Sequence, residues 1–406
     1  MRTATEPHLD KILIHNIGEF YTGDLDAPVL PVRAVAIADG LVAEFDPASH
    51  DGFDTVIDAA GCAVVPGLID GHVHPVAGEW TPTQDAIGWV GNYLHGGTTT
   101  MLSAGELHTP GLDYGRMTPD LVTALAEVNA STFGSHRPAG VKLHAGTALL
   151  VPGMSERHFD RLAAAGARLV KFLFYPFARD PEEARRYVQW ARERGLRSKV
   201  HTGGVSRSGV SQICGFEILS WLQPDIAAHV SGGPIPMSDA DLDRVIDELH
   251  FPLEICSSGN YLSGHRAVTR LVARGELGRL TLGSDTPGGT GVIPRGAWRN
   301  VLFLASMCGL SPAQAIAVAT GNTGRAHGLA EGILAPGRPA DLALCGPVEG
   351  SAGSTLADAV AHGDLPGITH VLIDGRAVVA GRSRQTPPPR LRPVVACCGP
   401  NFGAAA

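Results

Sequence analysis

Residues 63–74 read AVVPGLIDGHVH, a short apolar run that leads into an aspartate, a glycine and two histidines. Short apolar runs bounded by turn residues are typical of strands that are buried on both faces. Side chains two positions apart on a strand point to the same face, so His72 and His74 can reach one common point. The stretch therefore predicts a buried strand that carries two imidazoles at its carboxyl end.

Similar apolar runs recur along the chain as far as about Gly328, and segments of helical periodicity separate them. Helix start signals open several of these segments, at Ser155–Glu156, Pro181–Glu183 and Ser238–Asp239. Eight strand–helix units over about 265 residues are typical of an α/β fold of the (β/α)₈ TIM-barrel type, predicted here for residues 66–328. The eight runs are Ala63–Val65, Thr98–Leu102, Val141–His144, Leu169–Phe174, Ser198–His201, Ile226–His229, Leu253–Cys256 and Leu280–Gly283.

Both ends of the chain carry alternating segments typical of half-buried strands, two of which turn at Asp–Gly pairs. Strands at both ends that have no partner nearby are expected to pair with each other. We therefore expect a small β-sandwich built from residues 1–65 and 329–385, followed by an extended, poorly ordered tail over residues 386–406. The segments are Lys11–His15, Ala34–Ala38, Leu41–Phe45, Asp341–Leu344 and His370–Val379.

The composition excludes several classes of protein. The chain has 406 residues, 44% hydrophobic and 18% charged, with a net charge of −8, which excludes a disordered chain and disfavours general nucleic-acid binding. The seven cysteines form no C-x-x-C pair, so a cysteine-based zinc site is not expected. Gly288–Gly291 lacks the lysine of a phosphate-binding loop. Charged residues from Glu6 to Lys11 and the lack of a long apolar run predict a cytoplasmic protein without membrane contact.

Further polar residues stand in or at the ends of later runs, namely Lys171 in the fourth, His201 and His229 in the fifth and sixth, and Asp285 after the eighth. In barrels of this type the chemistry lies at the carboxyl ends of the strands. A single histidine at such a place is commonly structural, but four histidines and an aspartate together suit Zn²⁺ or Fe²⁺. The pattern predicts a metal centre, and it leaves the identity of the metal open.

Lys171 requires its own interpretation, because an ammonium group beside a divalent metal would be repelled. Its apolar and aromatic surroundings should lower the pKa of the amine and make it nucleophilic. Since no carboxylate closes this run and a pair of metals needs a bridge, we predict that CO₂ converts Lys171 to a carbamate. A lysine whose ammonium reaches solvent or forms a salt bridge at the barrel mouth is the alternative.

With these residues in place, the chain resembles the amidohydrolase superfamily of metal-dependent hydrolases over nearly its whole length. The resemblance rests first on His72–Val73–His74 after Pro66–Asp70, and then on His201, His229 and Ser284–Asp285. Within the superfamily, several stretches are most similar to enamidases, which open the ring of a tetrahydro-oxonicotinate. These stretches are His95–Met101, Arg137–Lys142, His201–Gly204, Gly232–Pro234, Gly291–Pro294, Ala319–Asn322 and Gly363–Ile368. The resemblance implies a small-molecule substrate and a homo-oligomer, specifically a tetramer.

One departure concerns the metal bridge. The resemblance to enamidases implies a glutamate as the metal bridge at the end of the fourth strand. This chain has Lys171 there instead. Lys171 makes the site similar to the hydantoinase and dihydroorotase branch, which hydrolyses cyclic amides through a carboxylated lysine. The substrate class common to both branches is a cyclic amide.

The predicted function is therefore two-metal hydrolysis of the C–N bond of a lactam, enamide or imide by a metal-bridged hydroxide. His72, His74 and Asp285 would hold the more buried metal and His201 and His229 the more exposed one, with carboxylated Lys171 between them. Asp285 would accept the proton of the attacking hydroxide and pass it to the departing nitrogen.

Substrate contacts are expected from Arg295, which could pair with an acidic group, and from His144, Asn260 and Tyr261. The alternative enzyme is a one-metal deaminase of a small heterocycle, which would not need Lys171. A barrel kept only as a scaffold is a third reading, disfavoured because polar groups that converge on one barrel mouth are costly to bury.

Overall fold

The computed structural model describes residues 10–75, 88–105, 113–173, 177, 180–204, 213–233, 235–287 and 291–399. Phe174 of the fourth predicted run, Pro234, residues 288–290 and residues 400–406 of the predicted tail lie outside the described residues, as do Glu6 and His8. Among the helices in the described ranges, none combines the length and the apolar character needed to cross a membrane.

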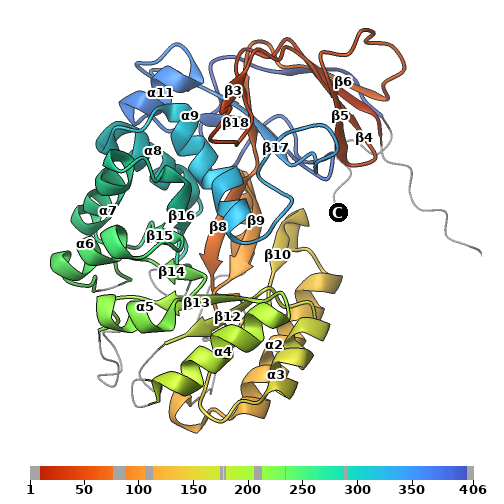
Figure 1. Ribbon diagram of the computed structural model, residues 1–406. Coiled ribbons are helices and arrows are strands. Elements are labelled where there is room, and N and C mark those ends of the chain that lie inside the picture. The colour runs from red at the N-terminus through yellow and green to blue at the C-terminus, as the bar shows by residue number, and fades with distance from the viewer. Residues whose placement is uncertain are drawn as a thin grey trace, which may run out of the picture.

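Two sheets of parallel strands form the centre of the molecule (Figure 1). One has the order β10-β9-β8 and the other the order β11-β12-β13-β14-β15-β16. Their strands are β8 (Leu68–Val73), β9 (Thr98–Ser103), β10 (Lys142–His144), β11 (Ala148–Leu149), β12 (Leu169–Phe172), β13 (Arg197–His201), β14 (Ile226–Ala228), β15 (Leu253–Cys256) and β16 (Leu280–Gly283). The third predicted run thus continues beyond a break as β11, and the expected α/β architecture is confirmed.

The helices lie on the outer side of these strands (Figure 1). The predicted start signals are confirmed, because α3 begins at Glu156, α4 at Pro181 and α6 at Asp239, where the Ser238 hydroxyl accepts from the Asp241 amide. The helices are α1 (Trp89–His95), α2 (Pro119–Ser135), α3 (Glu156–Ala164), α4 (Pro181–Glu193), α5 (Phe216–Leu222), α6 (Asp239–Glu248), α7 (Tyr261–Ala273), α8 (Gly296–Cys308), α9 (Pro312–Ala317), α10 (Thr323–Ala326) and α11 (Leu356–His362).

The first predicted barrel strand was placed wrongly. Ala63–Val65 lies in β7 (Ala63–Pro66), which pairs antiparallel with β17 in a different sheet, and the parallel strand is the next one, β8. A Cβ on Gly67, between the two, would lie 2.0 Å from the Thr99 Oγ1, so the chain needs glycine where it passes from one sheet to the other. An apolar run does not tell which sheet it joins.

Two further sheets combine strands from both ends of the chain. Their orders are β20-β6-β1-β4-β5 and β19-β18-β17-β7-β2-β3. Ile12, Val35 and Leu342 belong to one buried core that both sheets share. The strands are β1 (Ile12–His15), β2 (Phe20–Tyr21), β3 (Val29–Leu30), β4 (Val35–Ala38), β5 (Leu41–Phe45), β6 (Thr55–Asp58), β17 (Leu342–Gly346), β18 (Gly367–Ile373), β19 (Arg376–Val379) and β20 (Val394–Cys397).

The tail differs from the expectation of poor order. Its strand β20 pairs antiparallel with β6, so that Val395 lies opposite Ile57. Without this pairing, β6 would leave one row of backbone donors and acceptors open at the edge of the sheet. The described part of the tail therefore completes the terminal sheet.

A buried ion cluster joins β10 to the terminal sheets. The Lys142 ammonium lies 2.6 Å from an Asp374 oxygen, 2.8 Å from Asp341 and 3.3 Å from Glu331, and the Lys142 side chain is 6% exposed. Asp341 immediately precedes β17, and Asp374 lies in the turn between β18 and β19. One lysine thus compensates carboxylates from several segments of the smaller part of the fold.

The substitution Lys142→Met should lower the free energy of unfolding by about 3–5 kcal/mol, because it leaves buried carboxylates without a counter-ion. Urea unfolding monitored by tryptophan fluorescence measures this change. The control is Arg137→Met, which removes the more exposed contact of Arg137 with Asp374 and should cost about 1 kcal/mol or less. Equal costs for the two variants would contradict the role given to Lys142.

Candidate metal centre

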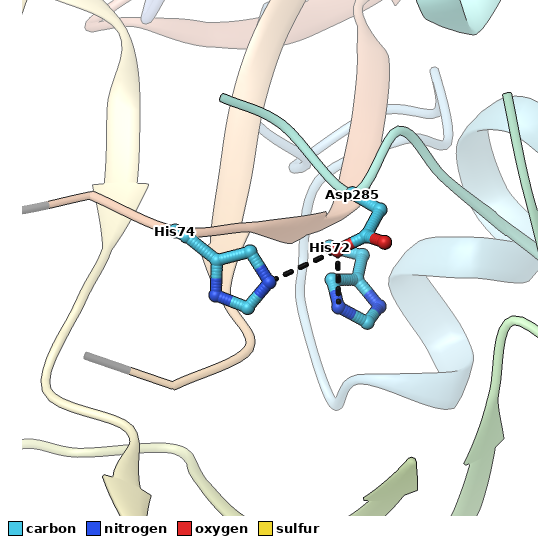
Figure 2. Close-up of side chains that lie close together, drawn as sticks. All are labelled: His72, His74 and Asp285. Atoms are coloured by element: carbon cyan, nitrogen blue, oxygen red, sulfur yellow. Dashed lines mark hydrogen bonds and ion pairs between the residues drawn. The ribbon is translucent and has the colours of Figure 1, made fainter. Parts of the chain in front are cut away.

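His72 and His74 stand at the carboxyl end of β8 with their rings turned toward Asp285 (Figure 2). The Nε2 atoms of His72 and His74 lie 3.4 Å and 3.0 Å from the Asp285 Oδ1. On the opposite side of each ring, His72 Nδ1 lies 2.6 Å from the Glu254 Oε1, and His74 Nδ1 lies 2.9 Å from the Gly105 carbonyl oxygen. Carboxylate and carbonyl oxygens accept hydrogen bonds, so Glu254 and Gly105 favour a proton on both Nδ1 atoms, which leaves each Nε2, the nitrogen that faces Asp285, as the atom able to bind a metal.

Asp285 is held in place by the contact between β16 and β8. Its amide donates to the His72 carbonyl at 2.9 Å, and the His74 amide donates to the Thr286 carbonyl at 2.7 Å. Asp285 adopts a left-handed backbone with φ of 62°, a conformation that is costly for a residue with a side chain. The surrounding hydrogen bonds therefore fix an unfavourable backbone that aims the carboxylate at the two histidines.

Asp70, on β8, adds to this contact. Its Oδ1 accepts from the Ser284 amide at 2.9 Å and its Oδ2 from the Ser284 hydroxyl. At Gly283 an added Cβ would lie 2.4 Å from the His72 Cβ, so only glycine lets the two strands come this close. Strands from the two ends of the parallel array thus become neighbours.

Lys171, His201 and His229 lie beside this pair of histidines. Lys171 Nζ lies 3.4 Å from the His72 Nε2, and the His229 ring centroid lies 5.2 Å from that of His72 and 4.5 Å from that of His201. In the part of the chain that is described, His201 Nε2 and His229 Nδ1 are buried without a hydrogen-bond partner. Buried polar atoms without partners are costly, and a cation bound between these rings would satisfy them.

The protonation states suit metal binding. Burial lowers the pKa of His72 and His229 well below the ordinary value, and it lowers the pKa of His201 to about 4. Burial raises the pKa of Asp285, but the neighbouring histidines outweigh this effect and hold it well below the usual range. The rings of His72, His201 and His229 are therefore neutral and the Asp285 carboxylate is ionised at neutral pH, as metal ligands must be.

Lys171 is also perturbed. Burial and then the positive charge of Lys199 lower the pKa of the Lys171 amine from 10.5 to about 8. Lys171 has no carboxylate partner among the ion pairs of the described residues. A larger share of the amine is therefore neutral at neutral pH than for an exposed lysine.

The predicted substrate-binding residues lie apart from this cluster, with no hydrogen bond or ion pair to it within the described ranges. Tyr261 is 58% exposed and lines a pocket with Ser257, Arg299, Asn300 and Leu302. The Asn260 side chain accepts from the first amides of α7, and Arg295 is exposed directly before α8.

His144 contacts a different set of groups. Its Nδ1 accepts from the Arg168 Nε at 3.2 Å, and the charges of Glu331 and Lys142 act on it. The printed hydrogen bond of His144 is therefore with Arg168 and not with the metal-binding histidines, and its role as a substrate contact stays a prediction.

Glu254 and Lys199 were missed by the sequence reasoning. Glu254 Oε1 accepts from His72 Nδ1 and Glu254 Oε2 accepts from Lys199 Nζ at 2.7 Å, and both side chains are fully buried. The available signal was a charged residue inside each of two short apolar runs, Leu253–Cys256 and Ser198–His201, at positions where burial requires a partner.

The sequence and the structure of this chain are both similar to those of known proteins. The sequence profile of the Amidohydrolase family matches residues 63–378. Enamidase from Eubacterium barkeri is 39% identical over 383 residues, which cover 94% of this chain and 98% of the relative. A solved enamidase structure superposes with a TM-score of 0.90 at 38% identity and covers 95% of this chain and all of that one. Adenine deaminase from Ruegeria pomeroyi is 26% identical over 339 residues. The match covers 78% of this chain and 51% of that relative.

The single substitutions of His72, His74, His201 and His229 to alanine should each lower the metal content of the purified protein. Each removes one imidazole whose lone pair faces the centre. Elemental analysis of protein purified without chelator gives the metal per chain. His362→Ala, at an exposed position on α11, is the matched control and should keep the wild-type content. A cluster variant with undiminished metal would remove that residue from the ligand set.

Metal content should also hold as the pH falls and drop only near pH 4 to 5. The pKa of His201 in the folded chain is about 4, below its ordinary 6.5, so protons compete with metal only when the pH approaches that value. Dialysis over a pH series followed by metal analysis measures the profile. Metal loss centred between pH 6 and 7 would show ordinary histidine pKa values and contradict the burial argument.

Proposed function

Because the chain belongs to the amidohydrolase family, we propose that it hydrolyses the C–N bond of a cyclic amide, namely a lactam, an enamide or an imide. The observation that carries the proposal is the meeting of the His72 and His74 Nε2 lone pairs with the Asp285 carboxylate, with Lys171 beside them. The similarity to enamidase along nearly the whole of both chains supports a cyclic amide as the substrate class.

The proposed scaffold is a closed (β/α)₈ barrel. Val73 forms a parallel bridge with Thr286, so β8 lies against the end of β16, and β10 and β11 share the third barrel position. A barrel closed in this way gathers the carboxyl ends of its strands at one mouth. We propose residues 66–328 as the barrel, and residues 1–65 and 329–385 together with strand β20 of the 386–406 tail as the β-sandwich.

The proposed centre holds two divalent metals, zinc or iron. His72, His74 and Asp285 would hold one of them and His201 and His229 the other. When bound, such metals lower the pKa of water toward neutrality and polarise a carbonyl group. Neutral imidazoles and an ionised carboxylate in a buried pocket are a donor set that fits both Zn²⁺ and Fe²⁺.

Lys171 is proposed to bridge the two metals as a carbamate. The neutral Nζ attacks CO₂, a new N–C bond forms and one proton leaves to solvent, which turns the neutral amine into an anion with two oxygens. The pKa of about 8 supports this step, because the neutral amine is the form that reacts. The position of Nζ beside His72 supports it as well, because an ammonium there would oppose metal binding.

Asp285 is proposed to carry the proton. It accepts the proton of the attacking hydroxide and delivers it to the departing ring nitrogen, so the nitrogen leaves as a neutral amine and not as an anion. Its Oδ2 lies toward Gly233, where an added Cβ would stand 3.6 Å away.

Arg295, Asn260 and Tyr261 are retained as proposed substrate contacts because they follow the ends of β15 and β16. An acidic group on the substrate would favour Arg295. The proposed binding partner is a small cyclic amide. We also propose that the protein is cytoplasmic and forms a homo-oligomer, and the resemblance suggests a tetramer.

A second candidate function is deamination of a small heterocycle by one metal. The specific observation in its favour is the similarity to adenine deaminases. Such a site would need no bridge at Lys171. The metal stoichiometry therefore separates the two candidates.

Asp285→Asn should lower kcat by about 100-fold or more while it retains metal better than a histidine variant. The amide can still offer one oxygen but cannot take up the proton. Hydrolysis of a panel of lactams, imides and hydantoins gives kcat, and elemental analysis gives metal content. Full activity of Asp285→Asn would rule out the proton-transfer role.

Lys171→Arg should reduce the metal content from about two ions per chain to one or fewer, because a guanidinium keeps the charge but cannot form a carbamate. Native and acid intact masses of the wild type should differ by one acid-labile CO₂. One metal per chain with an unmodified lysine would favour the deaminase.

A further inference from the structure

A fully buried ion pair lies behind His72, on the side away from Asp285. Lys199 on β13 and Glu254 on β15 have side chains that are 0% exposed, and Lys199 Nζ donates to the Glu254 Oε2 at 2.7 Å. Taking two charges out of water costs several kcal/mol per ion, and a pair of apolar residues would fill the same space as well or better. A pair kept at this cost calls for a role other than stability.

The pair is attached to the metal centre at three points. The other Glu254 oxygen accepts from His72 Nδ1 at 2.6 Å and, at 3.4 Å, from the backbone amide of His229. Lys199 Nζ donates at 2.6 Å to the carbonyl of Gly71, the residue before His72. One carboxylate thus contacts a predicted ligand of each metal, and one ammonium holds the backbone next to the first.

Glu254 is not placed as a metal ligand itself. Its Oε1 is occupied by His72 and its Oε2 by Lys199, so neither oxygen is free to leave without breaking a buried hydrogen bond. A Cβ on Gly71 would stand 2.7 Å from the Leu282 carbonyl oxygen and 3.3 Å from the Glu254 Oε2. Because Gly71 has no side chain, the space beside the Glu254 carboxylate stays free of a side chain from this position.

We propose that Glu254 is a positioning residue that fixes the proton of His72 on Nδ1 and the ring orientation, so that Nε2 faces the metal, and that Lys199 is the counter-ion that the buried Glu254 carboxylate requires. This inference rests on the proposed metal centre. A carboxylate that accepts from the far nitrogen of a metal-bound imidazole also makes the ring a stronger donor. The same carboxylate steadies His229, whose backbone φ is 32°.

Two double variants separate the hydrogen bond from the ion pair. Both carry Lys199→Met, which removes the ammonium, and they differ at the partner, Glu254→Gln in one and Glu254→Met in the other. Glutamine and methionine have similar size and neither is charged, but only glutamine can accept from His72 Nδ1. Neither variant leaves a buried charge without a counter-ion.

Metal affinity is measured by competition with a chelator, and folding by circular dichroism and thermal unfolding. The Gln variant should hold metal within about threefold of the wild type, and the Met variant should bind about 10–100-fold more weakly. Equal affinities of the two variants, whether both high or both low, would overturn the positioning role.

Two controls keep the outcome clear. If His72→Ala binds metal as tightly as the wild type, the proposed metal centre itself is wrong. If His72→Ala loses metal while the two double variants bind equally, only the role of Glu254 is wrong. A measurement without these substitutions, ¹⁵N spectra of the metal-free wild-type chain with His72 identified by its loss in His72→Gln, should show the proton on Nδ1. A proton on Nε2 would overturn the proposal even if the double variants do not fold.

Discussion

The parallel contact between β8 and the end of β16 is the constraint on which the site depends. The Asp285 amide donates to the His72 carbonyl, the His74 amide donates to the Thr286 carbonyl, and Asp70 binds Ser284 through both carboxylate oxygens. The bonds between Asp70 and Ser284 join residues 214 positions apart in the sequence. Together, all these bonds hold Asp285 in a left-handed backbone that would not persist without them. The metal-binding geometry is therefore a consequence of strand pairing.

The electrostatics of the interior follow from burial more than from pairwise attraction. Burial keeps the imidazoles of His72 and His201 neutral. Of the two buried lysines, Lys199 has a carboxylate partner and Lys171 has none among the described ion pairs. The terminal sheets compensate charge separately, through Lys142 and its carboxylates, so the described residues include a second buried ionic cluster with a different role. One joins the parts of the fold, and the other surrounds the candidate metal centre.

Much of the fold could be predicted because apolar runs and helix start signals are local. The period of the runs predicted parallel strands with helices outside, and α3, α4 and α6 begin where their caps predicted. What failed was non-local. Ala63–Val65 was assigned to the wrong sheet, and the pairing of β20 with β6 was missed, because strand partners depend on residues far away in the sequence. In the site, polar residues at strand ends drew notice, whereas Glu254 and Lys199, which lie inside apolar runs, were missed.

The contrast between Lys171 and Lys199 shows how one residue type takes two roles in the same interior. The two lysines stand opposite each other in the register of β12 and β13, and both are fully buried. Lys199 has Glu254 as a counter-ion and the Gly71 carbonyl as a second acceptor, so its charge is compensated and its position fixed. Lys171 has no such carboxylate among the described ion pairs, and the charge of Lys199 disfavours its protonation further. Within the ion pair that we infer to orient His72, the charge of Lys199 lowers the pKa of Lys171 and the charge of Glu254 raises it. The effect of Lys199 is the larger, so the pair favours the neutral amine that carboxylation requires.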